Sequence, residues 1–267
     1  MKLLNRKQAL LSLFIAASLG GAVVTDAVAQ SDRSSERASR KSKSGKAEEL
    51  YPQSTRQAPT IKPSSKLSSK LQKLIETFNK GEDYQGVRTQ ADEILANSAA
   101  NDADKALAAQ LAAQAAYNLD DTAAAKKYLQ QAIGLNALDN NGQFQSMLML
   151  AQLQMQDDQQ AEGLATLDKY LEESKSQRPE DLILKGQALY QTERYKEAIP
   201  VLKQAIAASP EPKDSWNQLL MASYAEAGQT GEAVAAAEAL AAKTPNDKKA
   251  QLNLANMYMQ ADQMDKA

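Results

Sequence analysis

The stretch ERYKEAIPVLKQAIAASP, residues 193–210, decides the fold of this chain. Its apolar residues recur at helical spacing, and Pro210 ends the helix because proline cannot continue the hydrogen-bond ladder. Pro200 lies in the first half of the same helix and removes one hydrogen bond, so we expect it on an outer face where this is tolerated. The stretch is either a lone surface helix or one unit of a repeating array.

Similar stretches recur along the chain and decide between these two readings. The reference residue is Ala198, a small residue in the first turn of the helix, and its counterparts are Val87 in YQGVRTQADEIL, Ala125 in TAAAKKYLQQAI, Gly163 in QAEGLATLDKYL, Ala233 in TGEAVAAAEALAAKTP and Ala267 in ADQMDKA. By subtraction, the steps between these markers are 38, 38, 35, 35 and 34 residues. Steps near 34 are typical of helix–turn–helix repeats. The longer first steps predict extended connections, such as GLNALDNN at residues 134–141.

Small residues mark the place where the two helices of each unit should cross, because two small side chains let the backbones approach closely. On the first helices these are Gly186, Ala151 and Ala255, and on the second helices Ala198, Gly163 and Ala267. The unit around Ala233 departs from this pattern. There Met221 holds the small position, and Ala237 stands where a large residue usually packs. Pro210 and Pro245 are expected to close their units.

These residues resemble the tetratricopeptide repeat family, most clearly in LKGQALYQTERYKEAIPVLKQAIAASP, residues 184–210. The resemblance covers most of residues 64–267. It implies an all-α fold, a right-handed superhelix of about five and a half helix pairs whose first helices line a concave groove. Because Ala267 falls at the start of a second helix in this register, we expect the solenoid to be truncated and to continue in a longer protein.

The family's groove positions, transferred by register, predict a protein-binding surface. They lie eleven, eight and seven residues before each marker: Gln114, Tyr117, Asn118, Gln152, Met155, Gln156, Gln187, Tyr190, Gln191, Asn256, Met259 and Gln260. An amide both donates and accepts hydrogen bonds, so a row of amides can pair with the backbone of an extended peptide. Tyr and Met add apolar contact area. The alternative is that the amides are solvated and that Tyr and Met only pack.

A narrower resemblance concerns two short motifs, ELYPQSTRQAP at residues 49–59 and DSWNQLLMASY at residues 214–224. They are similar to motifs of the periplasmic tetratricopeptide proteins associated with TonB-type energy transduction in proteobacteria. This resemblance implies a partner within an envelope transport or energy-transducing assembly.

The N-terminus predicts export. Residues 1–29 combine Lys2, Arg6 and Lys7 with an apolar stretch and small residues, which is the layout of a signal peptide. We expect cleavage between Ala29 and Gln30, with Ala27 and Ala29 as the small residues of the cleavage site. In a Gram-negative bacterium the product would be periplasmic; an uncleaved anchor is the alternative. Residues 30–63 are basic and Ser-rich, and we expect them to form a disordered leader ahead of a solenoid over residues 64–267. The leader is either a solvated spacer or an arm that binds an anionic surface.

The amino-acid composition limits the kinds of catalytic and metal-binding site that the chain can form. The chain contains no cysteine and no histidine, which excludes thiolate nucleophiles, Cys/His zinc sites, disulfides and imidazole catalysis. Lys and Arg total 31 against 33 Asp and Glu, so no net basic charge favours nucleic acid. We expect a non-catalytic protein without cofactor or metal, with a protein or peptide partner and no stable membrane insertion after signal cleavage; the oligomeric state stays open. The alternatives are an envelope scaffold that acts through its leader and the repeat part of a longer enzyme.

Overall fold

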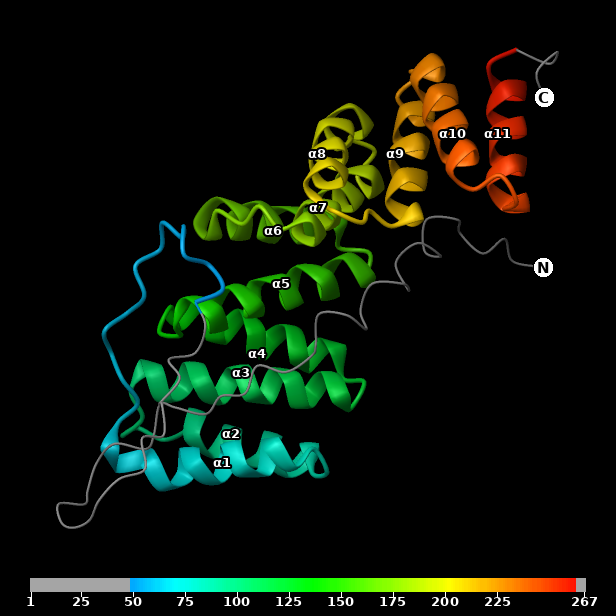
Figure 1. The fold of residues 1–267 in the computed structure, drawn as a ribbon. Helices are drawn as coiled ribbons and strands as arrows, with labels where there is room; N and C mark the ends of the chain where they lie inside the picture. The colour runs from blue at the N-terminus through cyan, green and yellow to red at the C-terminus, as the bar shows by residue number, and fades with distance from the viewer. Residues whose placement is uncertain (1–48, 263–267) are drawn as a thin grey trace, which may run out of the picture. The chain divides into compact units, whose positions relative to one another are not determined.

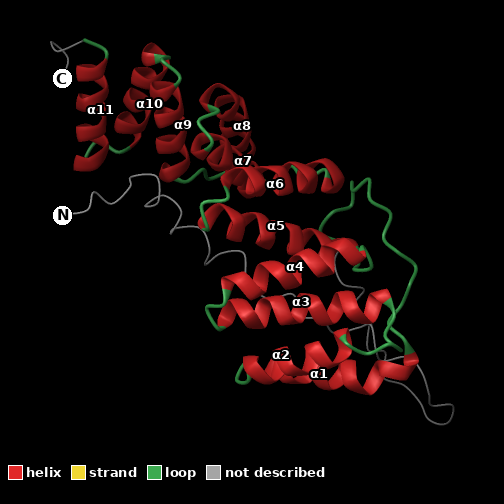
Figure 2. Ribbon diagram, turned by 180° about the vertical axis from the view of Figure 1, so that it is seen from behind, coloured by secondary structure: helices red, strands yellow, loops and turns green. Residues whose placement is uncertain are grey.

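The computed structural model describes residues 49–262, and all regular structure in that range is helical (Figures 1 and 2). The elements are η2 (Ser65–Leu67), α1 (Ser68–Lys80), α2 (Tyr84–Leu95), α3 (Asp102–Asn118), α4 (Thr122–Leu135), α5 (Asn140–Gln156), α6 (Gln160–Ser174), α7 (Pro179–Gln191), α8 (Tyr195–Ala208), α9 (Asp214–Glu226), α10 (Thr230–Lys243) and α11 (Lys248–Gln260). The predicted all-α repeat fold is confirmed for these residues.

The chain forms two compact units. Unit 1 extends to Asp158 and also includes Glu172–Lys175 at the end of α6, and unit 2 comprises Gln159–Leu171 and the residues from Ser176 onward. Within unit 1 the helices α1 to α5 pack one after another, and within unit 2 the helices α7 to α11 do the same. Successive first helices also touch, α1 with α3 and α7 with α9. Each unit is therefore a stack of helix pairs.

The register of the repeat is confirmed by the second helices. In α2, α4, α6, α8 and α10 alike, the marker is the fourth residue and is buried: Val87, Ala125, Gly163, Ala198 and Ala233. Five residues before a marker the backbone enters the left-handed region, at Asp120, Asp158, Glu193, Gly228 and Asp262. The turn at Glu193 is representative, because Arg194 N–H then donates to the Leu189 carbonyl at 2.9 Å and closes a Schellman-type helix end. Asp262 keeps the same register, while Ala267 lies outside the described residues.

The extra residues of the early repeats lie in helices, and the prediction of extended connections is wrong. Helices α3 and α5 have 17 residues, whereas α1, α7, α9 and α11 have 13. The connection from α4 to α5 is only residues 136–139. The added turn of α5 is capped by Asp139, whose Oδ1 accepts from Gly142 N–H at 2.7 Å. In α3, Asn101 and Asp104 form a reciprocal capping box at the corresponding end.

The helix crossing pairs a small residue with a large one. A Cβ on Gly186 would lie 2.6 Å from Cγ of Leu202, one turn beyond Ala198, so the side chain that faces Gly186 is Leu202 and not the expected Ala198. In the unit of α9 and α10 the sizes are exchanged, with Met221 and Ala237 both buried. Pro200 is exposed, as expected, and α8 and α10 end at Ala208 and Lys243, just before Pro210 and Pro245.

Residues 49–63, which we call the strap, pack against unit 1, so the prediction of a disordered leader up to residue 63 is wrong for them. Figure 1 shows the strap in blue, running along helix ends of unit 1 down to α1. Tyr51 is only 2% exposed, and its ring meets Phe144 of α5 edge-on, with centroids 4.9 Å apart. At the other end, Ser64 N–H donates to Oδ1 of Asp104 at 2.7 Å. The leader's earlier part and the cleavage residues Ala27, Ala29 and Gln30 lie outside the described residues.

Candidate functional site

In unit 1 the predicted groove residues lie on α3 and α5, which present them at helical spacing on one face of each helix. Gln114, Tyr117, Gln152 and Gln156 are half-buried, and Asn118 is exposed. Asn118 Nδ2 donates to the Gln114 carbonyl at 2.8 Å, so this amide provides a hydrogen bond to one of the free carbonyls at the end of its own helix. The face therefore offers mixed polar and aromatic side chains.

In unit 2 the predicted residues lie on α7 and α11. Tyr190, Gln191 and Asn256 are half-buried, whereas Met259 and Gln260 are exposed. The ring of Tyr190 packs edge-on against Tyr195 of α8, with centroids 5.2 Å apart. This contact fixes the orientation of an aromatic side chain that keeps part of its surface accessible.

Two predicted groove residues have almost no accessible surface. Met155 is 4% exposed and Gln187 is 6% exposed, so the prediction of a ligand contact is wrong for both in the chain alone. Gln187 adjoins the crossing residue Gly186 on α7, a helix that packs against both α8 and α9, which explains its burial. Between α7 and α11, α9 presents Ala222 and Ala225 at the corresponding positions. The amide row is therefore interrupted within unit 2.

One groove amide lacks a partner. The Oε1 atom of Gln191 is covered and accepts no hydrogen bond from the described residues. An unpaired buried acceptor costs about 1–3 kcal/mol, so a donor that reaches this amide after a rotation of the side chain would gain that energy.

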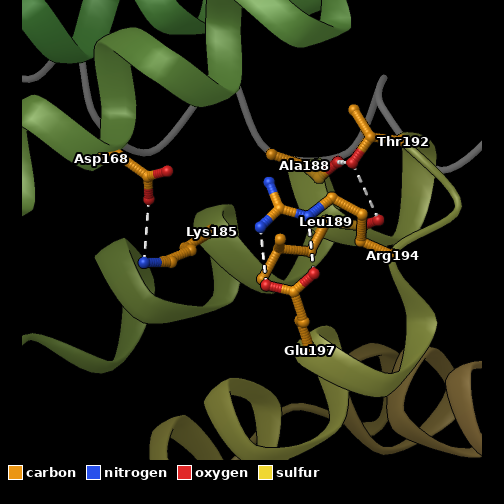
Figure 3. Close-up of polar contacts among 7 residues, drawn as sticks. All are labelled: Asp168, Lys185, Ala188, Leu189, Thr192, Arg194 and Glu197. Carbon is orange, nitrogen blue, oxygen red and sulfur yellow. Dashed lines mark hydrogen bonds and ion pairs between the residues drawn. The ribbon is translucent and has the colours of Figure 1, made fainter.

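Polar contacts hold the neighbouring backbone of α7 in place (Figure 3). Lys185 Nζ lies 2.8 Å from Oδ1 of Asp168, which links α7 to α6. Thr192 Oγ1 donates toward the Ala188 and Leu189 carbonyls at 2.9 and 3.1 Å, closing the helix end. These contacts orient the last turn of α7, which carries Tyr190 and Gln191.

The start of α8 carries a surface ion pair beside this turn. Arg194 donates to both carboxylate oxygens of Glu197, at 2.8 and 2.6 Å. The hydrogen bond to Glu197 raises the pKa of Arg194, and the same hydrogen bond lowers the pKa of Glu197. Both groups are exposed, so the pair orients side chains and contributes little stability.

The buried polar cluster of unit 2 is structural. Tyr170 and Ser176 hydroxyls each donate to Oδ2 of Asp181 at 2.5 Å, at the first turn of α7. Among the described residues, no group of three or more acidic, His or Cys side chains is arranged to bind a metal ion.

Sequence reasoning missed the strap as a functional element. Its anchors, Tyr51 and Arg56, both lie in ELYPQSTRQAP, which we used only as a family motif. The available signal was Tyr51 itself, since aromatic residues are few in disordered segments.

Comparisons with known proteins agree with this fold. A tetratricopeptide repeat family model matches residues 106–137, and the model of ChAPs (Chs5p-Arf1p-binding proteins) matches residues 122–267. The chain belongs to the tetratricopeptide repeat family. The ChAPs model covers more than half of the chain, so the chain also belongs to the family that this model describes. Tetratricopeptide repeats typically serve as non-catalytic scaffolds for protein interactions. A search of curated proteins found no match.

Solved structures show the same fold. A tetratricopeptide repeat protein from Parabacteroides merdae aligns with a TM-score of 0.56 at 14% identity, covering 73% of this chain and 75% of that chain. MamA from Desulfovibrio magneticus RS-1 aligns with a TM-score of 0.53 at 20% identity, covering 61% of this chain and 89% of that chain. At these identities the similarity establishes the fold alone. Within residues 49–262 no helix combines the length and apolarity needed to cross a membrane.

Proposed function

We propose that this protein is a non-catalytic interaction module that binds a protein segment in extended conformation on the faces of its first helices. The observation that carries the proposal is the recurrence of half-buried or exposed amide side chains at one register of a repeat fold, on α3 and α5 of unit 1 and on α7 and α11 of unit 2, with a tyrosine beside them on α3 and α7. Such stacked arrays present an extended surface, and their first helices face it.

The last turn of α7 is the strongest part of this surface. Tyr190 offers a fixed aromatic ring, and Gln191 offers an amide whose acceptor is unpaired. A backbone N–H of a bound peptide would satisfy that acceptor once a rotation of the Gln191 side chain has uncovered it, and apolar side chains would pack on the ring. Recognition of this kind depends on the shape and the backbone of the bound segment and not on its charge.

We further propose that the module acts in the periplasm, within an envelope transport or energy-transducing assembly. The support is the signal-peptide layout of residues 1–29 and the motifs ELYPQSTRQAP and DSWNQLLMASY. If the export proposal holds, the protein isolated from cells begins at Gln30 and is released by osmotic shock. A protein that keeps its N-terminus and stays with the cytoplasmic fraction would contradict it.

The binding proposal is tested by site-specific photo-crosslinking in cells from position 191. We choose Gln191 because it is accessible, whereas Gln187 is buried. The control probe replaces Lys203, an exposed residue of α8. We expect one protein captured from position 191 and not from position 203, with capture reduced at least tenfold when Tyr190 is also changed to Ala. The same adducts from both positions, or capture indifferent to Tyr190, would contradict binding on this face.

A further inference from the structure

The strap crosses unit 1 with a turn at residues 51–54, and its backbone is held by two asparagine side chains and by one backbone carbonyl. Leu50 N–H donates to Oδ1 of Asn141 at 3.1 Å, and the Arg56 carbonyl accepts from Nδ2 of Asn140 at 3.2 Å. Between them, Thr55 N–H donates to the Glu173 carbonyl at 2.9 Å. Asparagines at a helix end that pair with the backbone of a crossing chain are the arrangement expected of a peptide-binding surface.

Two side chains anchor the strap. The first is Tyr51, which is buried with its ring edge-on to Phe144. Phe144 lies just after the extra turn of α5, residues 140–143, and is fully buried. Phe144, the aromatic receptor for Tyr51, thus stands at the register position where the shorter helices α7 and α9 begin, and the added turn of α5 precedes it.

The second anchor is Arg56, whose guanidinium occupies a cradle formed by the α4–α5 connection. Its Nε donates to Oδ1 of Asn136 at 3.0 Å, and Nη1 donates to Oδ1 of Asn140 at 2.7 Å. Its Nη2 donates to the carbonyls of Leu138, at 2.9 Å, and of Asn136, at 3.3 Å. Asn136 can offer both oxygens because it ends α4 with φ of 50°, a conformation that asparagine tolerates.

The cradle selects an arginine. Its acceptors surround the planar guanidinium on several sides, and a lysine ammonium could meet only part of them. Burial lowers the pKa of Arg56, while the carboxylates of Glu173 and Asp139 act in the opposite direction. The site is therefore polar, partly desolvated and supplied with nearby negative charge.

From this geometry we propose that unit 1 carries a second binding site, which we call the strap socket, built for a segment with a tyrosine followed five residues later by an arginine, with a turn between the two. Residues 51–56 of the chain are its resident ligand. A turn lies between the two anchors, closed by Ser54 N–H, which donates to the Tyr51 carbonyl at 3.1 Å, so a ligand must bring its tyrosine and arginine to the socket through a turn of this kind. The socket uses the ends of α4, α5 and α6, and it does not depend on the binding faces of the first helices.

Because the chain fills its own socket, a segment of the same chemistry from another molecule must compete with the strap. The effective concentration of a covalently attached segment is in the millimolar range, so the unaltered chain is expected to exclude weak competitors. The socket becomes available when the two anchors are removed.

The test uses the full chain with the substitutions Tyr51→Ala and Arg56→Ala and a fluorescent synthetic peptide of sequence ELYPQSTRQAP. We expect fluorescence anisotropy to show binding to this variant and at least tenfold weaker binding to the unaltered chain. Peptides that carry Ala at the tyrosine position or Lys at the arginine position should each bind the variant at least tenfold more weakly. Absence of binding, or equal binding of all three peptides, would overturn the proposal.

A second variant guards against unfolding of the doubly substituted chain. Arg56→Lys keeps the Tyr51 anchor, and the peptide with arginine should displace its strap more readily than the strap of the unaltered chain. Circular dichroism confirms that each variant stays helical. If the Arg56→Lys chain is folded and binds the peptide no better than the unaltered chain, the socket does not discriminate arginine and the proposal fails.

Discussion

Gly186 of α7 faces Leu202 of α8 so closely that a Cβ on the glycine would lie 2.6 Å from the leucine Cγ. The added Cβ would overlap Cδ2 and also Cγ of Leu202, so a rotation that moves only the tip of the leucine cannot relieve the overlap. Gly186→Ala should therefore destabilise the chain by about 1–2 kcal/mol, because overpacking outweighs the gain of about 1 kcal/mol in helix propensity. Urea denaturation of the purified chain measures this change.

The partner substitution identifies the cause of that loss. Leu202→Ala alone should destabilise by about 2–5 kcal/mol through the cavity that it leaves. In the double variant the alanine at 186 meets no leucine, so the combined loss should be smaller than the sum of the single losses. Strict additivity would mean that the two side chains do not oppose each other.

Two glycines three residues apart should respond to alanine in opposite directions. Gly228 has φ of 74° in the α9–α10 turn, and Gly231 lies in the first turn of α10; added Cβ atoms meet no atom within 4 Å at either position. Gly228→Ala should cost about 1 kcal/mol from backbone strain alone. Gly231→Ala should stabilise by up to about 1 kcal/mol. The difference in unfolding midpoints tests both, and equal effects would contradict the backbone argument.

The buried carboxyl of Asp181 should matter more than either of its donors. Tyr170→Phe removes the hydrogen bond to Asp181, and Ser176→Ala removes that bond and the one that Ser176 Oγ accepts from Arg178 N–H at 3.3 Å; each should cost about 1–3 kcal/mol. Asp181→Ala leaves two buried hydroxyls without their acceptor and should cost more than either. Hydrogen exchange of α7 amides is the suitable readout, since repeat arrays can open locally. Unchanged hydrogen exchange of the α7 amides in the Asp181→Ala variant would show that the cluster does not contribute to stability.

Alkaline pH should weaken unit 1 through Tyr128. Burial raises the pKa of Tyr128, assisted by the hydrogen bond of its hydroxyl to Asp92 of α2 at 2.7 Å. An unfolded tyrosine titrates near pH 10, so this contribution to stability is complete below about pH 10 and is lost as the pH rises through the higher folded value.

Urea midpoints of the Tyr128→Phe variant and the unaltered chain, compared between pH 9 and 11, should therefore show a shallower alkaline decline for the variant. Tyr258→Phe is the matched variant in unit 2, where the hydrogen bond to Glu238 raises the pKa of Tyr258. Hydrogen exchange assigns each change to its unit. An unchanged decline in unit 1 after Tyr128→Phe would contradict the prediction.

The candidate surfaces were predictable only in part. Register placed Tyr190 and Gln191 correctly on an accessible turn, because the spacing of a helix fixes which residues share a face. It could not foresee that Gln187 is buried, since that depends on how α7 packs between α8 and α9. The strap socket joins residues 80 or more positions apart, such as Arg56 and Asn136, and no local pattern reveals such a pairing.

The sequence by itself determined the repeat, its register and the ends of α8 and α10, because these follow from periodic small residues such as Ala198 and Ala233 and from the breakers Pro210 and Pro245. The tertiary structure alone decided where the additional residues of the early repeats go and what they do. They extend α3 and α5 by one turn, since Asn101 and Asp139 cap those turns, and the strap then packs on them. The physical reason is that periodicity acts between neighbours along the chain, whereas the fate of Tyr51 and Arg56 depends on partners brought together only by folding.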